Sequence, residues 1–464
     1  MSAEQPFWFE QALAQEPPQP PNVLQGKTNA DVCIIGGGYT GLWTAIKLKQ
    51  QAPEKDVVVI DKGLCGQGAS GRNGGCMLTL STKYATLARL FGQKEAIRLV
   101  KASDQAVYDI ADFCLKHNID AEIRLDGALY TATNSIQKAN LHKPLASLKL
   151  AGINQWQSKG DDFVQQYSGS TFNQQGIFSA AAGSLQPGKL VRGLARVARQ
   201  LGVRIFENTP MTTIDYGKIV KVTTAKGEIK TPRLVLAMNA WMAQTFKTFR
   251  RSIVLVSSDM LITKPMPDEL AAMNFNHGMV VADSRIFVHY YRSTPDGRLM
   301  LGKGGNLFSY GNKMLAAFDQ PSAYQKMLQN SFQRFFPSLP HHFERSWTGA
   351  SDRSVTGVPF FGRFEGQSNV FYGLGYSGNG VVQSYLGGDI LSSLVLDKDN
   401  EWTRSGMSQG CRGHFPIEPF RTLGAQIVRN SVLRKESMED NEQQAYWLDT
   451  QLAKLASAAG KADK

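Results

Sequence analysis

The sequence contains few cysteines, no long hydrophobic run and no leader-like N-terminus. Its five cysteines are scattered without the spacing of metal ligands: Cys33, Cys65, Cys76, Cys114 and Cys411. That pattern argues against a structural zinc site and a disulfide framework, and it fits a reducing compartment. No apolar run approaches the roughly eighteen residues of a membrane span, and the first residues lack the basic start and apolar core of a signal peptide. We therefore expect a cytoplasmic protein without a membrane span or a metal.

Acidic residues are also in deficit, with 39 Asp and Glu against 51 Lys and Arg among 464 residues and a formal charge of +12 at pH 7. A positive excess raises the encounter rate with anionic ligands. Three alternatives are open: a small anionic substrate, a solvated basic surface without function, and nucleic acid. The sequence has no aromatic-basic RNA-binding motif, so a nucleic-acid partner is not expected. The length allows two or three domains, or two interleaved ones.

The chain is organised around a complete β-α-β unit between residues 31 and 62. The apolar run 31–35 ends in a Gly-x-Gly-x-x-Gly turn at 36–41, a helical stretch follows, and the strand 57–60 runs into Asp61. In such a turn the first glycine permits tight geometry, the second admits a pyrophosphate, and the third lets the helix pack on the strand. An acid about twenty residues later accepts hydrogen bonds from ribose hydroxyls. The unit predicts a dinucleotide site, against the alternative of a glycine turn that binds nothing.

Two further glycine-rich segments follow strands. Residues 66–75 hold five glycines in ten positions, which excludes a regular helix or strand and lets backbone lie against a flat ligand. The alternative is a mobile surface loop. Residues 370–380 read as a strand, a glycine-rich turn and a helix start, which can direct backbone N–H groups at a ligand atom that becomes negative.

Hydrophobic periodicity outlines the rest of the chain. Helices are expected at 83–118, 134–151, 190–201, 324–336 and 381–396, and strands at 127–131, 176–178, 203–206, 219–222, 223–230, 234–237, 279–281, 286–291 and 299–301. Residues 1–30 are predicted to form a peripheral arm, with aromatics at 7–9 on the domain surface and an extended proline cluster at 17–21. The C-terminal segment is expected to be peripheral and partly disordered, with a polar helix near 437–457.

Taken together, the three glycine-rich segments resemble those of the glycine oxidase, sarcosine oxidase and D-amino-acid oxidase superfamily of FAD enzymes. The resemblance covers roughly residues 30–400. Segments 68–75, 290–292, 347–349 and 375–378 are similar to those of γ-glutamylputrescine oxidoreductases. The segment 354–362, the overall length and the long tail resemble aminophosphonate oxidoreductases.

The resemblance implies an α/β (α+β) fold with two interleaved domains. A Rossmann-like FAD-binding domain would comprise 31–80, 180–250 and 350–410, and an antiparallel-sheet substrate domain 81–179 and 251–349. Residues 1–30 would be an N-terminal arm and 411–464 a C-terminal extension. FAD is expected to be non-covalent, because no obvious attachment residue lies in 70–75, although Cys76 directly after this loop is a candidate.

The same resemblance implies where FAD lies. Adenine would meet the backbone at Met211, the ribityl chain and flavin would follow 70–75, and the pyrimidine end would border 376–381. The expected cofactor-binding residues are Gly36, Gly38, Tyr39, Thr40, Gly41, Asp61, Lys62, Ser70, Gly71, Arg72, Asn73, Gly74, Gly75, Met211, Gly375, Tyr376, Ser377, Gly378, Asn379, Gly380 and Val381.

The expected substrate-binding residues are Tyr290, Tyr291, Arg292, Lys303 and Arg353. Adjacent strand residues point to opposite faces, so one tyrosine should line the pocket and the other the core; the alternative is that neither contacts substrate. At least one of the three cations is expected to reach the pocket, because guanidinium forks match phosphonate oxygens in bidentate fashion. For each cation singly, a surface or structural salt bridge is the alternative.

Two positions depart from the family pattern. Met300 stands where sarcosine oxidases hold a lysine thought to activate oxygen, and Ser351 where glycine oxidase holds its carboxylate-binding arginine. Oxygen as acceptor and a plain carboxylate as the substrate's handle are therefore both open. No catalytic base is expected, because the flavin supplies the chemistry and desolvation lowers the pKa of a substrate ammonium. His289 is predicted to be a structural histidine on a strand face.

The sequence therefore predicts an FAD-dependent oxidoreductase that oxidises an amine C–N bond to an imine, which hydrolyses to an aldehyde plus an amine or ammonia. The predicted substrate is an aminophosphonate such as 2-aminoethylphosphonate or its N-methyl derivative. The alternatives are γ-glutamylputrescine or another amino or imino acid, a tRNA-modifying oxidase, and a non-catalytic flavoprotein. The electron acceptor is oxygen or another oxidant.

Overall fold

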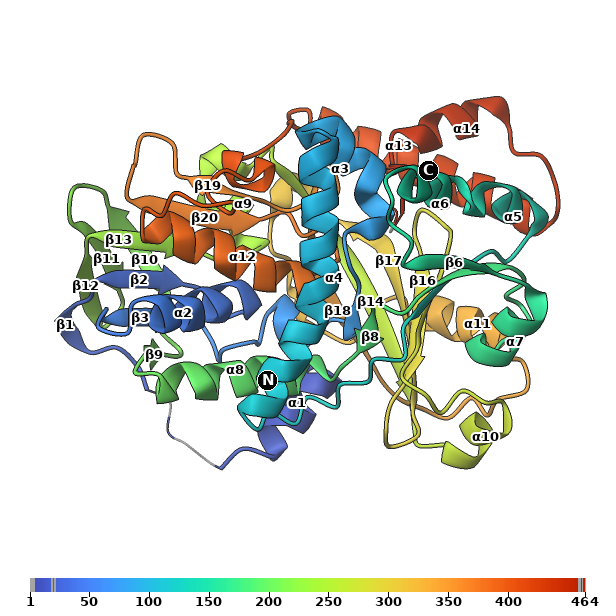
Figure 1. The fold of residues 1–464 in the computed structure, drawn as a ribbon, viewed down its shortest axis with the longest axis horizontal. Coiled ribbons are helices and arrows are strands. Elements are labelled where there is room, and N and C mark those ends of the chain that lie inside the picture. The colour runs from blue at the N-terminus through green and yellow to red at the C-terminus, as the bar shows by residue number, and fades with distance from the viewer. Residues whose placement is uncertain (1–4, 18–19, 21, 458–459, 461, 464) are drawn as a thin grey trace.

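A computed structural model describes residues 5–17, 20, 22–457, 460 and 462–463. Its two largest β-sheets lie side by side, and the long helix α4 (Gln93–Lys116) runs vertically at the centre of Figure 1. Within the described ranges, no helix is both long and apolar enough to cross a membrane.

The first sheet has six strands in the order β19-β20-β13-β2-β3-β9. All neighbours are parallel except β19 and β20. Parallel sheets are covered on both faces, which is why their strands read as continuous apolar runs. The strands are β2 (Val32–Ile35), β3 (Val57–Ile60), β9 (Arg204–Phe206), β13 (Arg233–Leu236), β19 (Phe360–Arg363) and β20 (Val370–Leu374).

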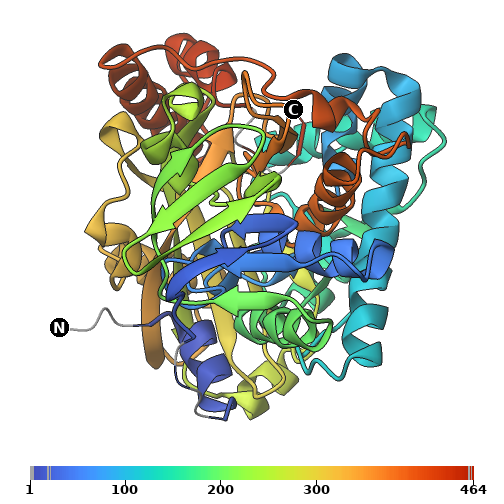
Figure 2. The same cartoon turned by 90° about the vertical axis from the view of Figure 1, so that its left-hand side faces the viewer.

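Different layers cover the two faces of this sheet. Ile34 and Val59 pack in a core with helices α2 (Tyr39–Gln51), α8 (Pro187–Gln200) and α12 (Gly380–Val395), whereas Cys33 and Val58 pack towards a four-stranded sheet. That small sheet lies at the end of the molecule facing the viewer in Figure 2. Its order is β1 (Gly26–Asn29), β12 (Gly227–Thr231), β11 (Val220–Thr224) and β10 (Met211–Asp215).

The second large sheet has eight strands, antiparallel throughout except for the pair β15 and β5. In order they are β18 (Phe343–Ser354), β14 (Ile253–Thr263), β17 (Leu299–Phe308), β16 (His289–Ser293), β15 (Val280–Asp283), β5 (Ala128–Thr131), β7 (Gly176–Ser179) and β6 (Trp156–Lys159). A core with many phenylalanines packs this sheet against α11 (Gln325–Phe335), α10 (Pro267–Ala272) and α7 (Asp161–Ser168).

The predicted fold class, a Rossmann-like sheet interleaved with an antiparallel sheet, is confirmed. The domain boundaries stay a prediction. Strand β18 crosses the boundary drawn at residue 350, and β1 of the expected N-terminal arm joins the four-stranded sheet. The remaining elements are α9 (Trp241–Thr245) and a two-stranded ladder of β4 (Cys76–Met77) and β8 (Gly183–Ser184).

Two expected helices are each divided. The helix expected at 83–118 consists of α3 (Tyr84–Phe91) and α4, separated by Gly92 with a φ of +84°. The helix expected at 134–151 consists of α5 (Ser135–Leu141) and α6 (Lys143–Leu150). Pro144 lies in the first turn of α6, where its missing N–H costs nothing, but in the interior of one long helix it would remove a hydrogen bond. The strand expected at 286–291 begins only at His289.

The N-terminal aromatics correct the prediction of a surface arm. They begin helix α1 (Phe7–Ala14), and Trp8 and Phe9 are fully buried. The Gln186 Nε2 donates to the Trp8 carbonyl at 2.8 Å, and the Arg292 guanidinium lies 4.8 Å from the Trp8 ring. Pro18, Gln19 and Pro21 of the proline cluster lie outside the described residues.

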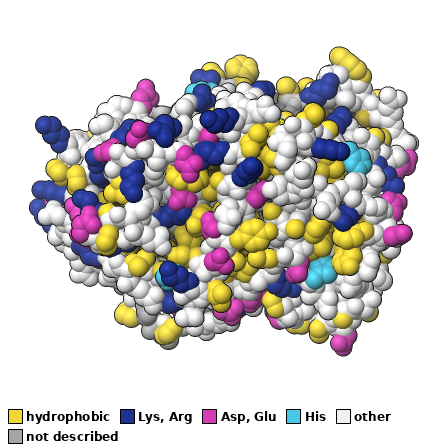
Figure 3. Space-filling model, viewed as in Figure 1, with side chains coloured by type: hydrophobic (Ala, Val, Ile, Leu, Met, Phe, Trp, Pro, Cys, Tyr) yellow, Lys and Arg dark blue, Asp and Glu magenta, His cyan; other side chains and the backbone are white. Residues whose placement is uncertain are grey.

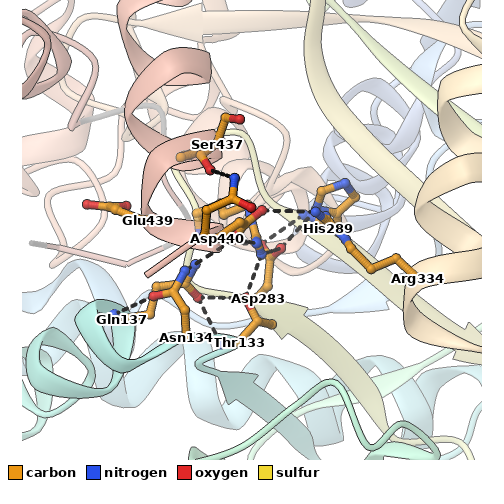
Figure 4. Close-up of polar contacts among 12 residues, drawn as sticks. Thr133, Asn134, Gln137, Asp283, His289, Arg334, Ser437, Glu439 and Asp440 are labelled. Atoms are coloured by element: carbon orange, nitrogen blue, oxygen red, sulfur yellow. Dashed lines mark hydrogen bonds and ion pairs between the residues drawn. The ribbon is translucent and has the colours of Figure 1, made fainter. Parts of the chain in front are cut away.

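The C-terminal extension is ordered over most of its length, contrary to the prediction. It forms α13 (Phe420–Asp440) and α14 (Trp447–Lys454) in place of one helix near 437–457. Asp440 accepts from Arg334 at 2.9 Å (Figure 4) and from Arg285. Glu436 accepts from the Ile286 N–H at 2.9 Å. Its polar composition suggested disorder, but these charges are paired with α11 and with the segment between β15 and β16.

Candidate active site

The turn between β2 and α2 is shaped to admit a phosphate. Gly36 has a φ of +113°, and a Cβ built on it would lie 2.4 Å from the Ala237 carbonyl oxygen. A Cβ on Gly41 would lie 1.9 Å from the Gly36 oxygen, so the helix packs closely on the turn. Gly38, the N-cap of α2, makes no side-chain cap bond. The first turn of the helix thus presents N–H groups and the positive end of its dipole.

Asp61 closes this turn from the end of β3. Its Oδ2 accepts from the Gly37 N–H at 2.7 Å and its Oδ1 from the Gly63 N–H at 2.9 Å. Burial raises the pKa of Asp61 to about 6, although both N–H groups oppose that rise. The carboxylate lines a groove of about 530 Å³ together with Gly36, Lys62, Met211 and other residues. The elongated groove and its donors fit the adenosine diphosphate part of FAD.

The loop 66–75 is held rigid by its own polar groups and is not a mobile surface loop. Ser70 Oγ accepts from the Tyr39 N–H at 2.9 Å, which links the loop to α2. Asn73 Nδ2 donates to the Ser70 carbonyl at 2.9 Å, and Asn73 Oδ1 accepts from the Gly75 N–H at 2.8 Å. Arg72 donates to backbone carbonyls on both sides and pairs with Asp319 at 2.9 Å. The loop therefore presents a preformed backbone surface.

A second cavity continues from the groove and is walled by both large sheets. The Thr40 Oγ and the Tyr376 hydroxyl lie 2.6 Å apart and join the two glycine-rich turns at its edge. Residues shared by groove and cavity make them continuous: Tyr39, Thr40, Ala69, Ser70 and Asn239. The substrate-domain wall includes Ser258, Met260, Tyr290 and Ser351. This arrangement fits a flavin ring against 70–74, with a substrate on the side of the eight-stranded sheet.

The predicted cofactor residues divide into those that line these spaces and those that shape the turns. The lining residues are Gly36, Gly38, Tyr39, Thr40, Asp61, Lys62, Ser70, Arg72, Asn73, Gly74, Met211, Tyr376, Gly378, Gly380 and Val381. Gly41, Gly71, Gly75, Gly375 and Ser377 are not among them and act through backbone geometry. Asn379 lines a small neighbouring cavity instead.

The two adjacent tyrosines face opposite sides of β16. Tyr290 lines the cavity, with its hydroxyl 3.0 Å from Ser258 Oγ. Tyr291 lies in the phenylalanine-rich core, where its hydroxyl donates to the Ser168 carbonyl at 2.8 Å and accepts from Asn173 at 2.6 Å. Burial raises the pKa of both hydroxyls above the ordinary value. The structure therefore leaves Tyr290 as a candidate and corrects the prediction for Tyr291.

Arg292 and Lys303 also correct the prediction, because neither lines the cavity. Arg292 Nε donates to the Gly74 carbonyl at 2.7 Å and another of its nitrogens to the Leu185 carbonyl at 2.8 Å. Burial lowers its pKa to about 10. Lys303 Nζ donates to the Phe287 carbonyl at 2.8 Å. Arg292 thus braces the loop 66–75 through the Gly74 carbonyl, and Lys303 stabilises the segment before β16.

Arg353 and Ser351 lie two residues apart on β18, and Arg353, unlike Ser351, is not itself a lining residue of the cavity. Ser351 lines the cavity, and its buried Oγ has no hydrogen-bond partner among the described residues. A guanidinium nitrogen of Arg353 and Ser351 Oγ each lie 3.5 Å from the position of a Cβ built on the lining residue Gly378. Burial lowers the pKa of Arg353, and Tyr290 and Asp352 offset part of this effect. A hydroxyl donor and a guanidinium thus converge beside one glycine.

The remaining predicted positions are structural or border the flavin loop. His289 Nδ1 lies 2.8 Å from Asp283, and its pKa falls to about 3 through burial and the nearby Lys303 charge. Met300 is buried behind Gly74, with its Cε 3.1 Å from the position of a Cβ there. Cys76 lines the cavity, so its position leaves covalent attachment as an experimental question.

Sequence reasoning missed several lining residues, above all Asn239 and Trp241 after β13. Asn239 adopts a φ of +48°, and the Trp241 ring lies 4.2 Å from Lys62 Nζ. The signal that could have found them is their position after the carboxyl end of a parallel strand, where such sheets bind ligands.

Comparison with known proteins agrees with this geometry. The family model described as FAD dependent oxidoreductase (DAO) matches residues 31–394. γ-Glutamylputrescine oxidoreductase of Escherichia coli K12 is 27% identical over 407 residues, 87% of this chain and 91% of that protein. The structure of glycine oxidase from Geobacillus kaustophilus superposes with a TM-score of 0.69 at 19% identity, covering 83% of this chain and 99% of that one.

A structure of L-α-glycerophosphate oxidase from Mycoplasma pneumoniae with FAD bound superposes with a TM-score of 0.63 at 16% identity, covering 82% of this chain and 98% of that one. When bound, FAD would accept a hydride, that is a proton with two electrons, from a substrate carbon. The glycine-lined start of α2, the Asp61 carboxylate and the rigid loop 70–74 fit this cofactor. The predicted cofactor and enzyme class are thereby confirmed, and the chain belongs to the DAO family of FAD-dependent oxidoreductases.

Proposed function

We propose that this protein oxidises the C–N bond of a small amine that carries an anionic group, with 2-aminoethylphosphonate or its N-methyl derivative as the leading candidate. The observation that carries the proposal is the position of the Arg353 guanidinium and the unpartnered Ser351 hydroxyl, which both lie beside the cavity-lining residue Gly378. A buried hydroxyl without a partner loses free energy unless a ligand satisfies it. Burial disfavours the charged form of a guanidinium, and a nearby anion stabilises that charged form.

The chemistry of the anion follows from this pair. A phosphonate carries between one and two negative charges at neutral pH, by analogy with phosphate esters, and its oxygens match a guanidinium fork. One oxygen can accept from Arg353 while another accepts from Ser351, because both groups lie beside Gly378. In this chain the arginine stands two residues along the strand from Ser351, the position at which glycine oxidase holds its carboxylate-binding arginine. This displacement supports an anionic substrate group that differs in size and geometry from an amino-acid carboxylate.

The residues of the chain then have the following roles. Tyr290 and Ser258, which are hydrogen-bonded to each other, wall the reacting end of the cavity and exclude water. Desolvation there lowers the pKa of the substrate ammonium and favours the neutral amine. Arg292 holds the Gly74 carbonyl in place and so fixes the surface on which the ring rests. The imine that results would hydrolyse to an aldehyde plus an amine or ammonia.

γ-Glutamylputrescine is a second candidate substrate, because the similar Escherichia coli protein bears that name and the resemblance covers most of both chains. Another amino or imino acid is a further alternative. A role on tRNA has less support: on the face shown in Figure 3, Lys and Arg side chains are interspersed with acidic and hydrophobic ones and form no continuous basic band.

Anaerobic bleaching of the flavin tests the proposal independently of the acceptor. The panel comprises 2-aminoethylphosphonate, its N-methyl derivative, γ-glutamylputrescine, glycine and n-propylamine. We expect the phosphonates to bleach fastest. Faster bleaching by γ-glutamylputrescine would overturn the phosphonate assignment and leave amine oxidation intact. If no amine bleached the flavin, amine oxidation itself would be excluded.

A further inference from the structure

The C-terminal extension carries an unusual share of the exposed apolar side chains. Half of the large apolar residues exposed in the described ranges lie between 417 and 455, beyond the segment matched by the family model. On α13, Phe420, Leu423 and Ile427 are 66%, 54% and 55% exposed, and Ile417 just before the helix is 58% exposed. Spacings of three and four residues place the helical three on one face. The exposed stripe is contiguous along two turns.

The polarity of α13 is the reverse of that of an ordinary surface helix. Its buried side chains are mostly polar or charged: Arg421, Ser431, Val432, Glu436 and Glu439. Asp440 at its C-terminal end binds Arg334 of α11 (Figure 4) and Arg285, which lies between β15 and β16. A surface helix normally buries its apolar stripe. Here ion pairs and apolar contacts of Val428, Val432 and Leu433 hold the helix to the protein, and the stripe of Phe420, Leu423 and Ile427 is left exposed.

Exposed cations gather beside the N-terminal end of this stripe. Lys247, Arg250, Arg251 and Lys313 are all exposed. Backbone contacts hold their segments against the start of α13: the Phe415 N–H donates to the Arg251 carbonyl at 2.7 Å, and Arg421 donates to the Arg250 carbonyl. The nearest acid on the helix side, Glu418, is already paired with Arg421 at 2.6 Å. The surroundings of the stripe are therefore positive.

Helix α14, which packs against α13, carries further exposed apolar side chains. Trp447, Leu448 and Leu455 are 73%, 59% and 74% exposed. Ala456 at the end of α14 packs in the same cluster as Val428 of α13, so the two helices lie alongside each other. Tryptophan, leucine and phenylalanine beside Lys and Arg are the composition of helices that lie in a membrane interface.

We propose that this C-terminal apolar surface, made of Ile417, Phe420, Leu423 and Ile427 with the cations of 247–251 and 313, docks on an anionic phospholipid surface. A second copy of the chain is a poorer occupant, because a two-fold contact would bring the same cations together. The partner that covers this surface must offer an apolar layer for the exposed side chains and negative charge for the cations beside them. A bilayer with anionic headgroups supplies both, and each nearby cation strengthens such binding.

Co-sedimentation of the full-length flavoprotein with vesicles tests this proposal without any substrate. Vesicles of equimolar phosphatidylglycerol and phosphatidylcholine should sediment the protein, and vesicles of phosphatidylcholine alone should not. The double variant Leu423→Ser/Ile427→Ser should lower the partition by roughly tenfold or more, since two aliphatic side chains no longer enter the interface. Replacing Lys247 and Arg250 by Gln should lower it by roughly fivefold per charge.

A matched control is Leu115→Ser, which removes a leucine that is 81% exposed in the last turn of α4, outside the extension. This variant should bind like the unaltered protein. Equal binding of the Leu423→Ser/Ile427→Ser protein and the control would overturn the proposal. The proposal would also be overturned if the protein did not bind vesicles and instead formed a dimer in analytical ultracentrifugation that this double variant abolishes. Binding to acidic proteins in place of lipid would overturn it as well. Flavin bleaching by amines is measured separately, so its failure leaves this result unaffected.

Discussion

Replacement of Arg353 by Ala tests the proposed anion site most directly. The expected loss follows from Coulomb's law: two unit charges about 4 Å apart interact by about 4 kcal/mol at an effective dielectric constant of about 20. Arg353 is only partly buried, so solvent reduces this to about 3 kcal/mol. Since each 1.36 kcal/mol is about one power of ten in rate, Arg353→Ala should slow reduction of the flavin by 2-aminoethylphosphonate by roughly two powers of ten.

Anaerobic stopped-flow absorbance measures this rate for the phosphonate and for n-propylamine with the same protein preparation. The rate with propylamine should change by less than about threefold, because an uncharged tail makes no ion pair. FAD content should be unchanged, since Arg353 does not line the groove of the adenosine diphosphate. Arg353→Lys should recover part of the phosphonate rate, because charge returns without the bidentate fork.

The matched control is Arg363→Ala, which removes a 40%-exposed arginine of β19 that pairs with Asp397. It should leave both rates unchanged. Equal losses for phosphonate and propylamine in the Arg353→Ala protein would mean that the arginine supports the structure of the cavity and does not recognise an anion. An unchanged phosphonate rate would place the anion elsewhere.

Four further predictions concern the cofactor and the fold. Gly36→Val should abolish FAD binding, because a Cβ there meets the Ala237 oxygen at 2.4 Å, whereas Cys33→Ala should retain the flavin absorbance; normal FAD content in the valine variant would move the nucleotide elsewhere. Acid precipitation should leave the yellow colour in the supernatant, and a yellow pellet would instead indicate covalent flavin. Asp440→Ala should cost about 2 kcal/mol in urea unfolding, because it removes the carboxylate that accepts from both Arg285 and Arg334 while Arg285 keeps Asp283, against less than about 0.5 kcal/mol for the 84%-exposed control Asp399→Ala. The pKa of His289 falls from 6.5 to about 3 on folding, so the unfolded chain binds an extra proton between these values and stability should decrease as pH falls from 6.5 towards 3; His289→Gln should remove about one proton from that slope, and an unchanged slope would contradict the assignment.

Local patterns in the sequence were sufficient for the nucleotide half of the site. A Gly-x-Gly-x-x-Gly turn works through backbone geometry within a few residues, so Gly36, Gly41 and Asp61 could be placed without knowledge of distant segments. The same holds for the parallel strands, whose burial on both faces leaves a continuous apolar run in the sequence. The cofactor and fold class follow from these local signals and the family resemblance they carry.

Only the tertiary structure decided which cations reach the cavity and what the tail does. Because side chains alternate along a strand, the sequence predicts that Tyr290 and Tyr291 face opposite sides. Which of the two faces the cavity depends on the packing of two sheets formed by distant segments. Arg292 and Arg353 are alike in the sequence, yet one braces the Gly74 carbonyl and the other lies beside Gly378.

The charges of the C-terminal extension also found their partners only in the tertiary structure. Its polar composition is typical of disorder when considered alone, because unpaired charges cannot form a packed core. Asp440 meets Arg285 across 155 residues of chain, and that ion pair exists only after the sheet has formed. Because electrostatic pairing depends on distance in space, the sequence determined the local turns and strands, and the folded chain determined the partners of its charges.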